Sequence, residues 1–323
     1  MSVLGPAVLS MDLEAEAERI ADWMRDAVRG MRRRGLVVAM SGGIDSSVCA
    51  ALAVRAVGAD RVFGLLLPER DSSSRSTELG RQLATHLGIQ ADMHDIAPAL
   101  QAIGCYAEQE AAIREVFPAY GAGWKNKIVL QGGLDGGINF YRLIVESPQG
   151  ERHEARLPTG PYLRIVAATN HKQRLRKTME YFHADRLNYA VVGTPNRLEY
   201  DQGFFVKNGD GSADLKPIAH LYKTQVYAMA RHLGLPDPIC STTPTTDTYS
   251  LPQGQDEFYF ALPYAQMDLA LWAFEHGVPA ADLAPALGVD EPAAAAVYRD
   301  IVAKRRQAAY LHAAPLRLPE RTG

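Results

Sequence analysis

The stretch Leu36–Val48, LVVAMSGGIDSSV, decides the fold of this chain. Its first five residues, Leu36–Met40, are apolar and rich in valine, and a run of this length predicts a strand buried in a parallel sheet. The residues Ser41–Ser47 then predict a tight polar loop, and the small residues Val48–Val57 predict a helix. A strand, a loop and a helix in this order form the unit from which α/β folds are built.

The same alternation of strands and helices recurs along the chain. The serines at 72–74 are typical of a helix start, and Gly35 and Gly88 follow the ends of two predicted helices. The alternation predicts an α/β fold with a doubly wound, mostly parallel, Rossmann-like sheet. The further predicted strands are 62–67, 91–96 and 189–193, and the predicted helices are 13–34, 74–87, 99–116 and 172–187.

The segment Lys127–Pro158 interrupts this alternation. It contains the β-prone run Ile138–Val145 and the turn Ser147–Gly150, so we expect an inserted β-hairpin. After about Pro252 the periodicity is helical, and it predicts helices over 258–276, 280–287 and 291–310. We therefore expect a single domain, 1–323, with an insertion at 127–158 and a helical C-terminal subregion at 257–323.

Composition and charge exclude several classes of protein. The 323 residues are 47% hydrophobic, which is enough for a sizeable core, and the net charge of −3 gives no sign of general affinity for nucleic acid. The three cysteines are far apart and odd in number, so they predict neither a disulfide framework nor a C-x-x-C metal site. The sequence contains no apolar run of membrane-spanning length, and its acidic N-terminus does not resemble a signal peptide, so we expect a cytoplasmic protein.

The residues Ser41–Ser47, SGGIDSS, predict a phosphate-binding loop. Two glycines allow a sharp turn that exposes backbone N–H groups, and the following helix adds the positive end of its dipole. Ser41, Ser46 and Ser47 add hydroxyl donors, whereas Asp45 needs a cation in an anion site, so we interpret it as a Mg²⁺ ligand. An ordinary serine-capped turn would explain a bare Gly-Gly pair but not the whole motif, which is also distinct from the Walker pattern.

A second group of polar residues follows the predicted strand 189–193. Because the carboxyl ends of parallel strands face the ligand crevice, Glu199 is placed to complete a Mg²⁺ site with Asp45. Lys223, at the start of a further helix, offers a point charge for pyrophosphate. Taken alone, Glu199 fits a helix start equally well, and an isolated lysine such as Lys223 is more often solvated. Their interpretation therefore depends on the motifs around them.

Those motifs resemble the NAD synthetases. The phosphate loop is similar to that of the N-type ATP pyrophosphatases, which split ATP into AMP and pyrophosphate to activate a carboxyl or carbonyl oxygen. The NAD synthetase pattern adds G-T-x-N-x-x-E, a Gly/Asp-rich loop, L-x-K-x-x-V, a second phosphate loop and an N-x-x-x-R-x-R helix. The matching segments of this chain are, in that order, Gly193–Glu199, Gly203–Ile218, Leu221–Val226, Pro244–Asp247 and Asn170–Arg176.

The resemblance implies an adenine nucleotide alpha hydrolase-like fold and a role for each matching residue. The residues that would bind ATP are Ser41, Gly42, Gly43, Asp45, Ser46, Ser47, Thr194, Lys223 and Thr245. Three of these would carry catalysis, namely Asp45, Lys223 and Thr245. The acceptor substrate would contact Asn170, Arg174, Lys207, Asp210 and Asp214, and the metal ligands would be Asp45 and Glu199.

The activity that the resemblance implies is that of an ammonia-dependent NAD synthetase, a ligase that uses ATP and Mg²⁺. Such an enzyme adenylates the carboxylate of deamido-NAD and then amidates it, releasing AMP and pyrophosphate. The resemblance also implies a homodimer. The chain is too short to add an amidase domain, so we expect free ammonia or a separate glutaminase as the nitrogen source, and neither nucleic acid nor a membrane as partner.

Other interpretations stay open. Leu198 stands where the family commonly has Ser and Val206 where it has Thr, and such changes fit an amide ligase acting on a different carboxylate in a specialised pathway. A non-catalytic nucleotide-binding regulator would also keep the loop, although Asp45, Glu199 and Lys223 together favour turnover. A sulfur-transfer or tRNA-modifying pyrophosphatase would usually need paired cysteines and a basic face, and neither is visible.

Overall fold

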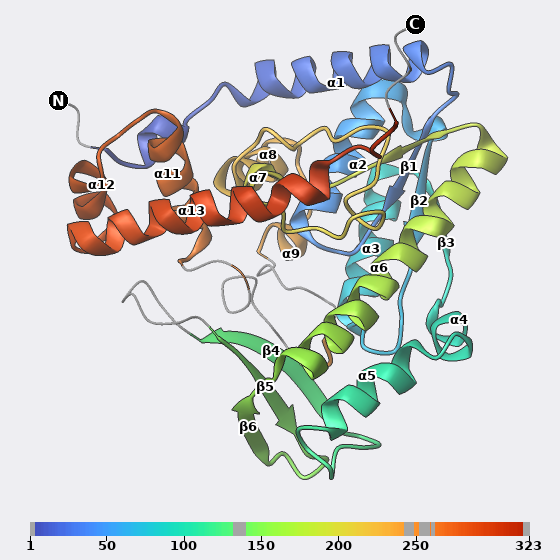
Figure 1. Ribbon diagram of the computed structural model, residues 1–323. Coiled ribbons are helices and arrows are strands. Elements are labelled where there is room, and N and C mark those ends of the chain that lie inside the picture. Colours follow the sequence, from blue (N-terminus) through green and yellow to red (C-terminus); the bar gives the residue numbers. More distant parts are fainter. Residues whose placement is uncertain (1–3, 132–139, 242–248, 252–258, 260–261, 319–323) are drawn as a thin grey trace, which may run out of the picture.

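A four-stranded parallel sheet lies at the centre of the computed structural model, which describes residues 4–131, 140–241, 249–251, 259 and 262–318 (Figure 1). The strand order is β3-β2-β1-β7, with Val37 of β1 paired to Phe63 on one side and to Val191 on the other. The strands are β1 (Leu36–Ala39), β2 (Val62–Leu66), β3 (Gln90–Met93) and β7 (Ala190–Val192).

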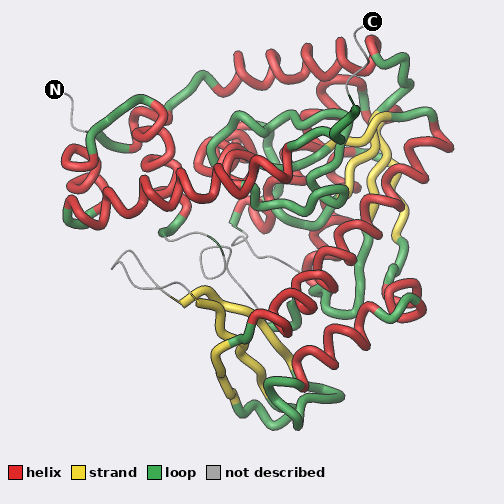
Figure 2. Tube along the Cα trace, in the orientation of Figure 1, coloured by secondary structure: helices red, strands yellow, loops and turns green. Residues whose placement is uncertain are grey.

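Helices cover both faces of this sheet (Figures 1 and 2), which confirms the predicted doubly wound α/β fold. Along β1 the buried side chains alternate, Leu36 and Val38 toward one face and Val37 toward the other. The first face packs against α1 (Leu13–Gly30), α2 (Ile44–Val57), α3 (Ser74–Leu87), α8 (Lys223–His232) and α9 (Asp237–Cys240). The second face packs against α4 (Ala97–Ala102), α5 (Cys105–Arg114) and α6 (Thr159–Leu187).

The direction in which strands are added to the sheet reverses at β1. β2 and β3 are added on one side of β1, whereas β7, which comes much later in the chain, is added on the other side. Ligands of open α/β sheets bind in the crevice outside the carboxyl ends of the strands at such a point. The SGGIDSS motif follows β1 and the segment Gly193–Glu199 follows β7, so the fold brings both predicted motifs to this edge.

A second sheet is antiparallel and lies beside the N-terminal half of α6 (Figure 1). Its strands are β4 (Lys125–Gln131), β5 (Phe140–Glu146) and β6 (Arg152–Arg156). The turn between β5 and β6 contains Gly150, whose φ is +85° and whose N–H donates to the carbonyl of Ser147 (2.9 Å). The segment predicted as a hairpin therefore contains parts of three strands.

The C-terminal helices form a core of their own together with the chain start. Their apolar side chains are buried against each other and against Leu9 and Leu198. The elements of this core are η1 (Pro6–Leu9), α7 (Arg197–Gln202), α11 (Tyr264–Glu275), α12 (Ala280–Leu287) and α13 (Glu291–His312). Elsewhere in the chain, the short turn η2 (Ala59–Arg61) precedes β2.

Several predicted boundaries are wrong, and each has a local cause. The helix predicted over 99–116 is broken at Gly104, whose φ of +78° lies in the left-handed region. The helix predicted from Phe258 includes α11, which begins at Tyr264 after Pro263 at the N-cap position, and Phe258 itself lies outside the described residues. Helix α6 begins at Thr159 instead of Lys172, since the apolar residues that follow position 159 are already spaced to face the core.

The three cysteines, Cys49, Cys105 and Cys240, are buried as free thiols. Burial raises the pKa of each, so little of the reactive thiolate is present. Within the described ranges, none of the helices combines the length and the apolar character that crossing a membrane requires.

Candidate active site

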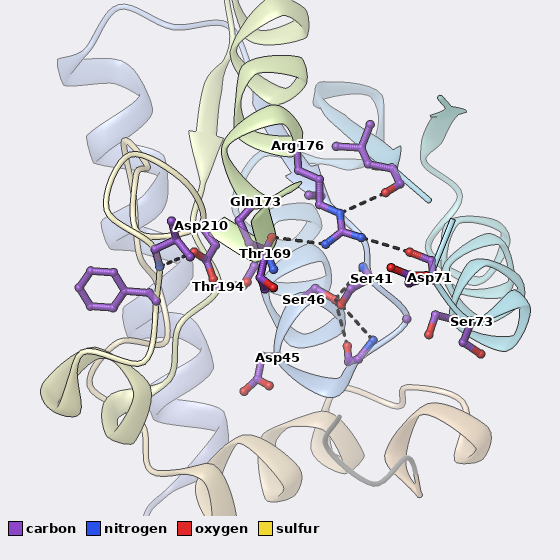
Figure 3. Close-up of a pocket in the computed structure, with 18 of the residues that line it drawn as sticks. Ser41, Asp45, Ser46, Asp71, Ser73, Thr169, Gln173, Arg176, Thr194 and Asp210 are labelled. Atoms are coloured by element: carbon purple, nitrogen blue, oxygen red, sulfur yellow. Dashed lines mark hydrogen bonds between the residues drawn. The ribbon is translucent and has the colours of Figure 1, made fainter. Parts of the chain in front are cut away.

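The phosphate-loop motif connects β1 to α2, and its turn is held by its own residues (Figure 3). Gly42 has a φ of +77°, and a Cβ at this position would overlap the carbonyl oxygen of Ser76. Ser41 Oγ accepts a hydrogen bond from the backbone N–H of Gly43 (3.3 Å) and lies 3.2 Å from Ser46 Oγ. Only glycine therefore fits at position 42, and the loop is preformed.

Helix α2 begins earlier than predicted, at Ile44, so Asp45, Ser46 and Ser47 occupy its first turn. The hydroxyls of Ser46 and Ser47 donate to the carbonyl of Gly43 (3.0 and 2.8 Å). Ser46 also lines the cavity described below, whereas Ser47 is fully buried and is not among the lining residues. Contact between Ser47 and ATP thus stays a prediction that this geometry does not favour.

Asp45 of α2 contacts side chains from the starts of two other helices, α7 and α8. Lys223, the first residue of α8, is 1% exposed and its ammonium group forms an ion pair with Asp45 Oδ2. Asn196, after β7, donates from Nδ2 to Asp45 Oδ1 (3.1 Å). Asp45 and Lys223, which lie far apart in the sequence and were each predicted to bind ATP, are therefore brought together, and Asn196 joins them.

Asn196 and Glu199 form a capping box at the start of α7. Asn196 Oδ1 accepts from the backbone N–H of Glu199 (3.1 Å), and Glu199 Oε2 accepts from the backbone N–H of Asn196 (3.2 Å). The sequence interpretation did not include Asn196 in the site. An Asn followed three residues later by Glu is a capping-box pattern, and this signal would have pointed to the pair.

The charges at Asp45, Glu199 and Lys223 influence one another strongly. Burial, and then the negative charge of Asp45, raise the pKa of Glu199, although Lys223 opposes this. Burial lowers the pKa of Lys223, but the charges of Asp45 and Glu199 outweigh it and the pKa is raised overall. Two carboxylates close enough to repel each other are a place where additional positive charge is favourable.

Gln173 and Arg176 on the inner face of α6 form a second wall of the site (Figure 3), and Asn170 of the same helix also lines the cavity. Arg176 donates to the carbonyl of Leu67 (3.2 Å) and to the hydroxyl of Ser72 (3.1 Å). Asn170 was predicted to be in the site and lines it. The segment after β2 was not predicted to take part.

Buried charges hold the segment after β2 in place. The ammonium of Lys172 on α6 pairs with Glu69 (3.1 Å) and Asp71 (2.6 Å), and Glu69 also accepts from the hydroxyl of Tyr106 (2.8 Å). Asp71 and its neighbours line the cavity. The partners of Lys172 lie about a hundred positions away in the sequence, and no local pattern indicates such a pair.

The predicted acceptor-binding residues divide into two groups. Asp210 lines the cavity, accepts from the backbone N–H of Val206 (2.7 Å), and has a pKa raised by burial. Asp214 instead accepts from the backbone N–H of Val191 (2.8 Å), and Lys207 donates to the carbonyls of Tyr310 and Ala313 (2.7 and 3.0 Å). Neither is among the lining residues.

Of the other predicted residues, Thr194 lines the cavity and Arg174 does not. Arg174 donates to the carbonyl of Lys207 (3.2 Å) and lies outside the cavity wall. Thr194 lines the cavity close to Gly193, where a Cβ would meet Ala213 at 2.7 Å. Thr245, with Thr246 and Asp247, lies outside the described residues.

Together these walls enclose a cavity of about 1190 Å³ at the carboxyl edge of the sheet (Figure 3). Its lining combines the phosphate loop, the segment after β2, the inner face of α6, the segment after β7 and Lys223. The backbone N–H groups in the first turn of α2 suit an anion, and the cavity is large enough for more than one small ligand.

One cluster of histidine and carboxylate groups lies outside the cavity, formed by Asp92, His94 and His183. Arg186 already supplies positive charge there, with Nη2 3.7 Å from Asp92 and Nε donating to His183 Nδ1 (3.0 Å). A metal ion would have to displace this guanidinium. We therefore describe the cluster as a structural contact between β3 and α6.

Comparisons with known proteins agree with one another. A family model described as NAD synthase matches residues 16–118 and 149–308. The NH3-dependent NAD+ synthetase of Mesorhizobium japonicum is 57% identical over 311 residues, which cover 96% of this chain and 98% of that relative. The protein of the same description from Rhizobium meliloti is 55% identical over 314 residues, with coverages of 97% and 94%.

A solved structure, that of NMN synthetase from Francisella tularensis, superimposes with a TM-score of 0.66. The match covers 96% of this chain and 99% of that one, at 21% sequence identity. At this level of identity the likeness concerns the fold.

Proposed function

This chain belongs to the NAD synthase family, which confirms the resemblance carried by its motifs, and we propose that it is an ammonia-dependent NAD synthetase. The reaction joins ammonia to the carboxylate of deamido-NAD at the expense of ATP, so the enzyme is a ligase that forms a C–N bond. Relatives at 55–57% identity over nearly the whole chain are the observation that carries this proposal.

The phosphate loop and Lys223 support the ATP half of the reaction. We propose that phosphate oxygens accept hydrogen bonds from the backbone N–H groups at the start of α2 and from the hydroxyls of Ser41 and Ser46, which line the cavity. Lys223 adds a buried positive charge where charge grows on the leaving pyrophosphate. We propose that Thr245 adds a donor from the second phosphate loop.

Asp45 and Glu199 suit Mg²⁺, because their carboxylates repel each other and carboxylate oxygens are the ligands that this ion prefers. When bound, the ion would neutralise charge on the phosphate oxygens. The ion pair with Lys223 and the hydrogen bond from Asn196 orient Asp45, so this carboxylate is held in place before ATP arrives.

In the first step, an oxygen of the acceptor carboxylate attacks the α-phosphorus of ATP. The bond from this phosphorus to the bridging oxygen breaks, and pyrophosphate leaves with the electron pair. In the second step, the nitrogen of ammonia attacks the acyl carbon, AMP leaves, and a proton is released. The protein contributes by positioning the reactants and by balancing charge, without a covalent intermediate of its own.

We place the acceptor along α6, where Asn170 lines the cavity, and beside Asp210. Lys207, Arg174 and Asp214 act indirectly in this proposal, since they hold the segment 203–216 against α6, β7 and α13. This assignment replaces the direct contacts that the sequence predicted for these three residues.

We further propose a cytoplasmic homodimer that takes free ammonia or ammonia from a separate glutaminase. Leu163 and Phe182 on α6 are each 58% exposed, and such apolar side chains suit a contact between subunits. Light scattering coupled to size-exclusion chromatography would test the stoichiometry, and a monomer at working concentration would exclude the dimer.

The activity is tested by incubating the protein with ATP, Mg²⁺, ammonium and deamido-NAD. The proposal requires NAD, AMP and pyrophosphate in equal amounts. Formation of AMP with another carboxylate but not with deamido-NAD would instead support an amide ligase for a different acid. Tight ATP binding without turnover of any carboxylate would support a regulator.

A further inference from the structure

Most of the antiparallel sheet β4-β5-β6 lies outside the residues that the family model matches. The match has one internal gap, residues 119–148, which includes β4 and β5. The sheet nevertheless shares a hydrophobic core with its neighbours, because Ile128 and Leu143 on its inner face are fully buried with Ile165 of α6 and Ile113 of α5.

Tyr141 stands where this inner face reaches the active-site cavity. Successive side chains of a strand point to opposite faces, so Tyr141, Leu143 and Val145 share one face of β5. Leu143 and Val145 are buried in the core, whereas Tyr141 lines the cavity. Its ring is stacked on Tyr162 of α6, with centroids 4.3 Å apart and an interplanar angle of 15°, and the two side chains are hydrogen bonded.

Two further tyrosines belong to the same wall, Tyr249 and Tyr259, which both line the cavity near Tyr162. Tyr249 is buried in the same core cluster, and its hydroxyl is hydrogen bonded to Thr169. The hydroxyl of Tyr259 donates to the carbonyl of Gln202 (2.7 Å). Tyr141, Tyr162, Tyr249 and Tyr259 are called the tyrosine wall below.

Strand β4 holds the chain beside this wall. The backbone N–H of Asn126 donates to Ser250 Oγ (2.8 Å), and the carbonyl of Asn126 accepts from the N–H of Leu251 (3.1 Å). The side-chain amide of Asn126 is itself fixed by donating to the hydroxyl of Tyr120 (2.8 Å). Ser250 and Leu251 also line the cavity. The sheet therefore contributes Tyr141 to the site, and through Asn126 it also positions Ser250 and Leu251.

We propose that the sheet β4-β5-β6 provides a subsite for an aromatic ring of a nucleotide substrate, and that Tyr141 determines the affinity of this subsite. Bases and the pyridine ring of nicotinate have flat π-faces that stack on tyrosine. The cavity of about 1190 Å³ exceeds the roughly 300–1,000 Å³ typical of one small-molecule site, and the reaction needs two nucleotides at once. The inference rests on the proposed function, which supplies those two substrates.

The test compares Tyr141→Leu, which removes the ring but keeps an apolar side chain, with Tyr141→Phe, which keeps the ring. Loss of one stacked ring is expected to raise the KM for one nucleotide by about five- to a hundredfold in the Leu variant. The kcat of both variants should stay within about twofold of the unsubstituted enzyme, and the Phe variant should keep a KM near the original. A rise in the KM for ATP assigns the subsite to the adenine of ATP, and a rise for deamido-NAD assigns it to the dinucleotide.

Arg152→Ala is the matched control, since Arg152 lies on β6 with its side chain 68% exposed and is not among the residues that line the cavity. The inference is overturned if neither KM changes by more than twofold in the folded Leu variant. It is equally overturned if Leu and Phe variants lose activity alike with a lowered melting temperature, because that pattern indicates a structural role alone.

The failure of this inference and that of the proposed function are distinguishable. If the unsubstituted protein makes no NAD, the proposed function fails. Equilibrium binding of ATP, and separately of deamido-NAD, to the unsubstituted protein and the Leu variant then still tests the subsite. Equal affinities of both proteins for both nucleotides would exclude it.

Discussion

At the scale of single residues, the ion pair between Asp45 and Lys223 serves both stability and chemistry. Asp45→Asn and Lys223→Met should each lower the rate of pyrophosphate release by about 10²–10³-fold, because each removes charge that acts on the leaving group. Each should also lower the free energy of unfolding, by up to about 3–5 kcal/mol, since a buried partner is left unpaired. Pyrophosphate release and urea denaturation measure the two effects.

The double variant Asp45→Asn/Lys223→Met separates these effects. Without either charge, no unpaired ion stays buried, so most of the lost stability should return while activity stays low. Full activity in either single variant would contradict the catalytic roles.

Gly42 tests the preformed loop, with Gly88 as its control. Both have positive φ, +77° and +65°, but a Cβ at Gly88 meets nothing within 4 Å whereas one at Gly42 overlaps Ser76. Gly88→Ala should cost about 1 kcal/mol of stability and leave the KM for ATP unchanged. Gly42→Ala should cost more and raise that KM, as measured by thermal unfolding and steady-state kinetics. Equal effects of the two substitutions would show that the close approach at Gly42 is unimportant.

Site residues within contiguous motifs were the predictable ones. The segment SGGIDSS and Glu199 are recognisable because the chemistry needs those side chains at a strand end, and the structure places both at one edge of the sheet. Arg176 was visible only as part of a helix motif. The buried ion pairs of Lys172 could not be predicted, because its partners, Glu69 and Asp71, come from a distant segment of the chain.

At the scale of secondary-structure elements, the start of α7 couples helix capping to the site. Asn196→Ala removes the cap and the hydrogen bond to Asp45. We expect a loss of about 1 kcal/mol in stability together with a fall in kcat, because Asp45 loses one of its two orienting partners. Thermal unfolding and NAD formation would be measured on the same samples.

Asp290→Ala is the matched control for this cap. Asp290 caps α13 by accepting from the N–H of Ala293 (2.9 Å), is exposed, and is not among the residues that line the cavity. Asp290→Ala should lose about as much stability as Asn196→Ala but should keep the kcat of the unsubstituted enzyme. A parallel fall in kcat for both variants would mean that helix capping alone accounts for the result.

Element boundaries were less predictable than element types. Periodicity identified the parallel strands because their residues are buried on both faces, as at Val62–Leu66. It did not show that α6 continues back to Thr159, because the helix has little overall amphipathicity: charged residues such as Lys172 and Lys177 are buried, whereas Leu163 and Phe182 are exposed. It predicted the hairpin of β5 and β6 but not the third strand, because that depends on the pairing of β4 with β5.

At the scale of the whole molecule, Asp268 joins the C-terminal helices to the nucleotide-binding part. This residue of α11 accepts from the backbone N–H groups of Lys223 (3.2 Å) and Thr224 (2.7 Å) at the start of α8. Burial raises its pKa to about 6, although these two hydrogen bonds oppose the shift. Its charged form is therefore less favourable in the folded state than in the unfolded chain.

The raised pKa of Asp268 gives a defined dependence of stability on pH. Below about pH 4 the group is protonated in both states, and the stability it contributes is fully present. As pH rises through about 6 this contribution is lost, at most about 3 kcal/mol for a shift of about two units. Urea denaturation at pH 4 and pH 7 should therefore show that the stability of Asp268→Asn, relative to that of the unsubstituted protein, is greater at pH 7 than at pH 4. A difference that does not vary with pH would contradict this.

The pairing of β1 with β7 also sets an order of events during synthesis. β1 leaves the ribosome early, but its partner Ala190–Val192 follows about 150 residues later. At roughly 5–20 residues per second, the nascent chain carries one open edge of β1 for about 8–30 s. Unpaired edges are templates for wrong pairing, so we expect this interval to be the period in which the newly made protein most needs chaperones.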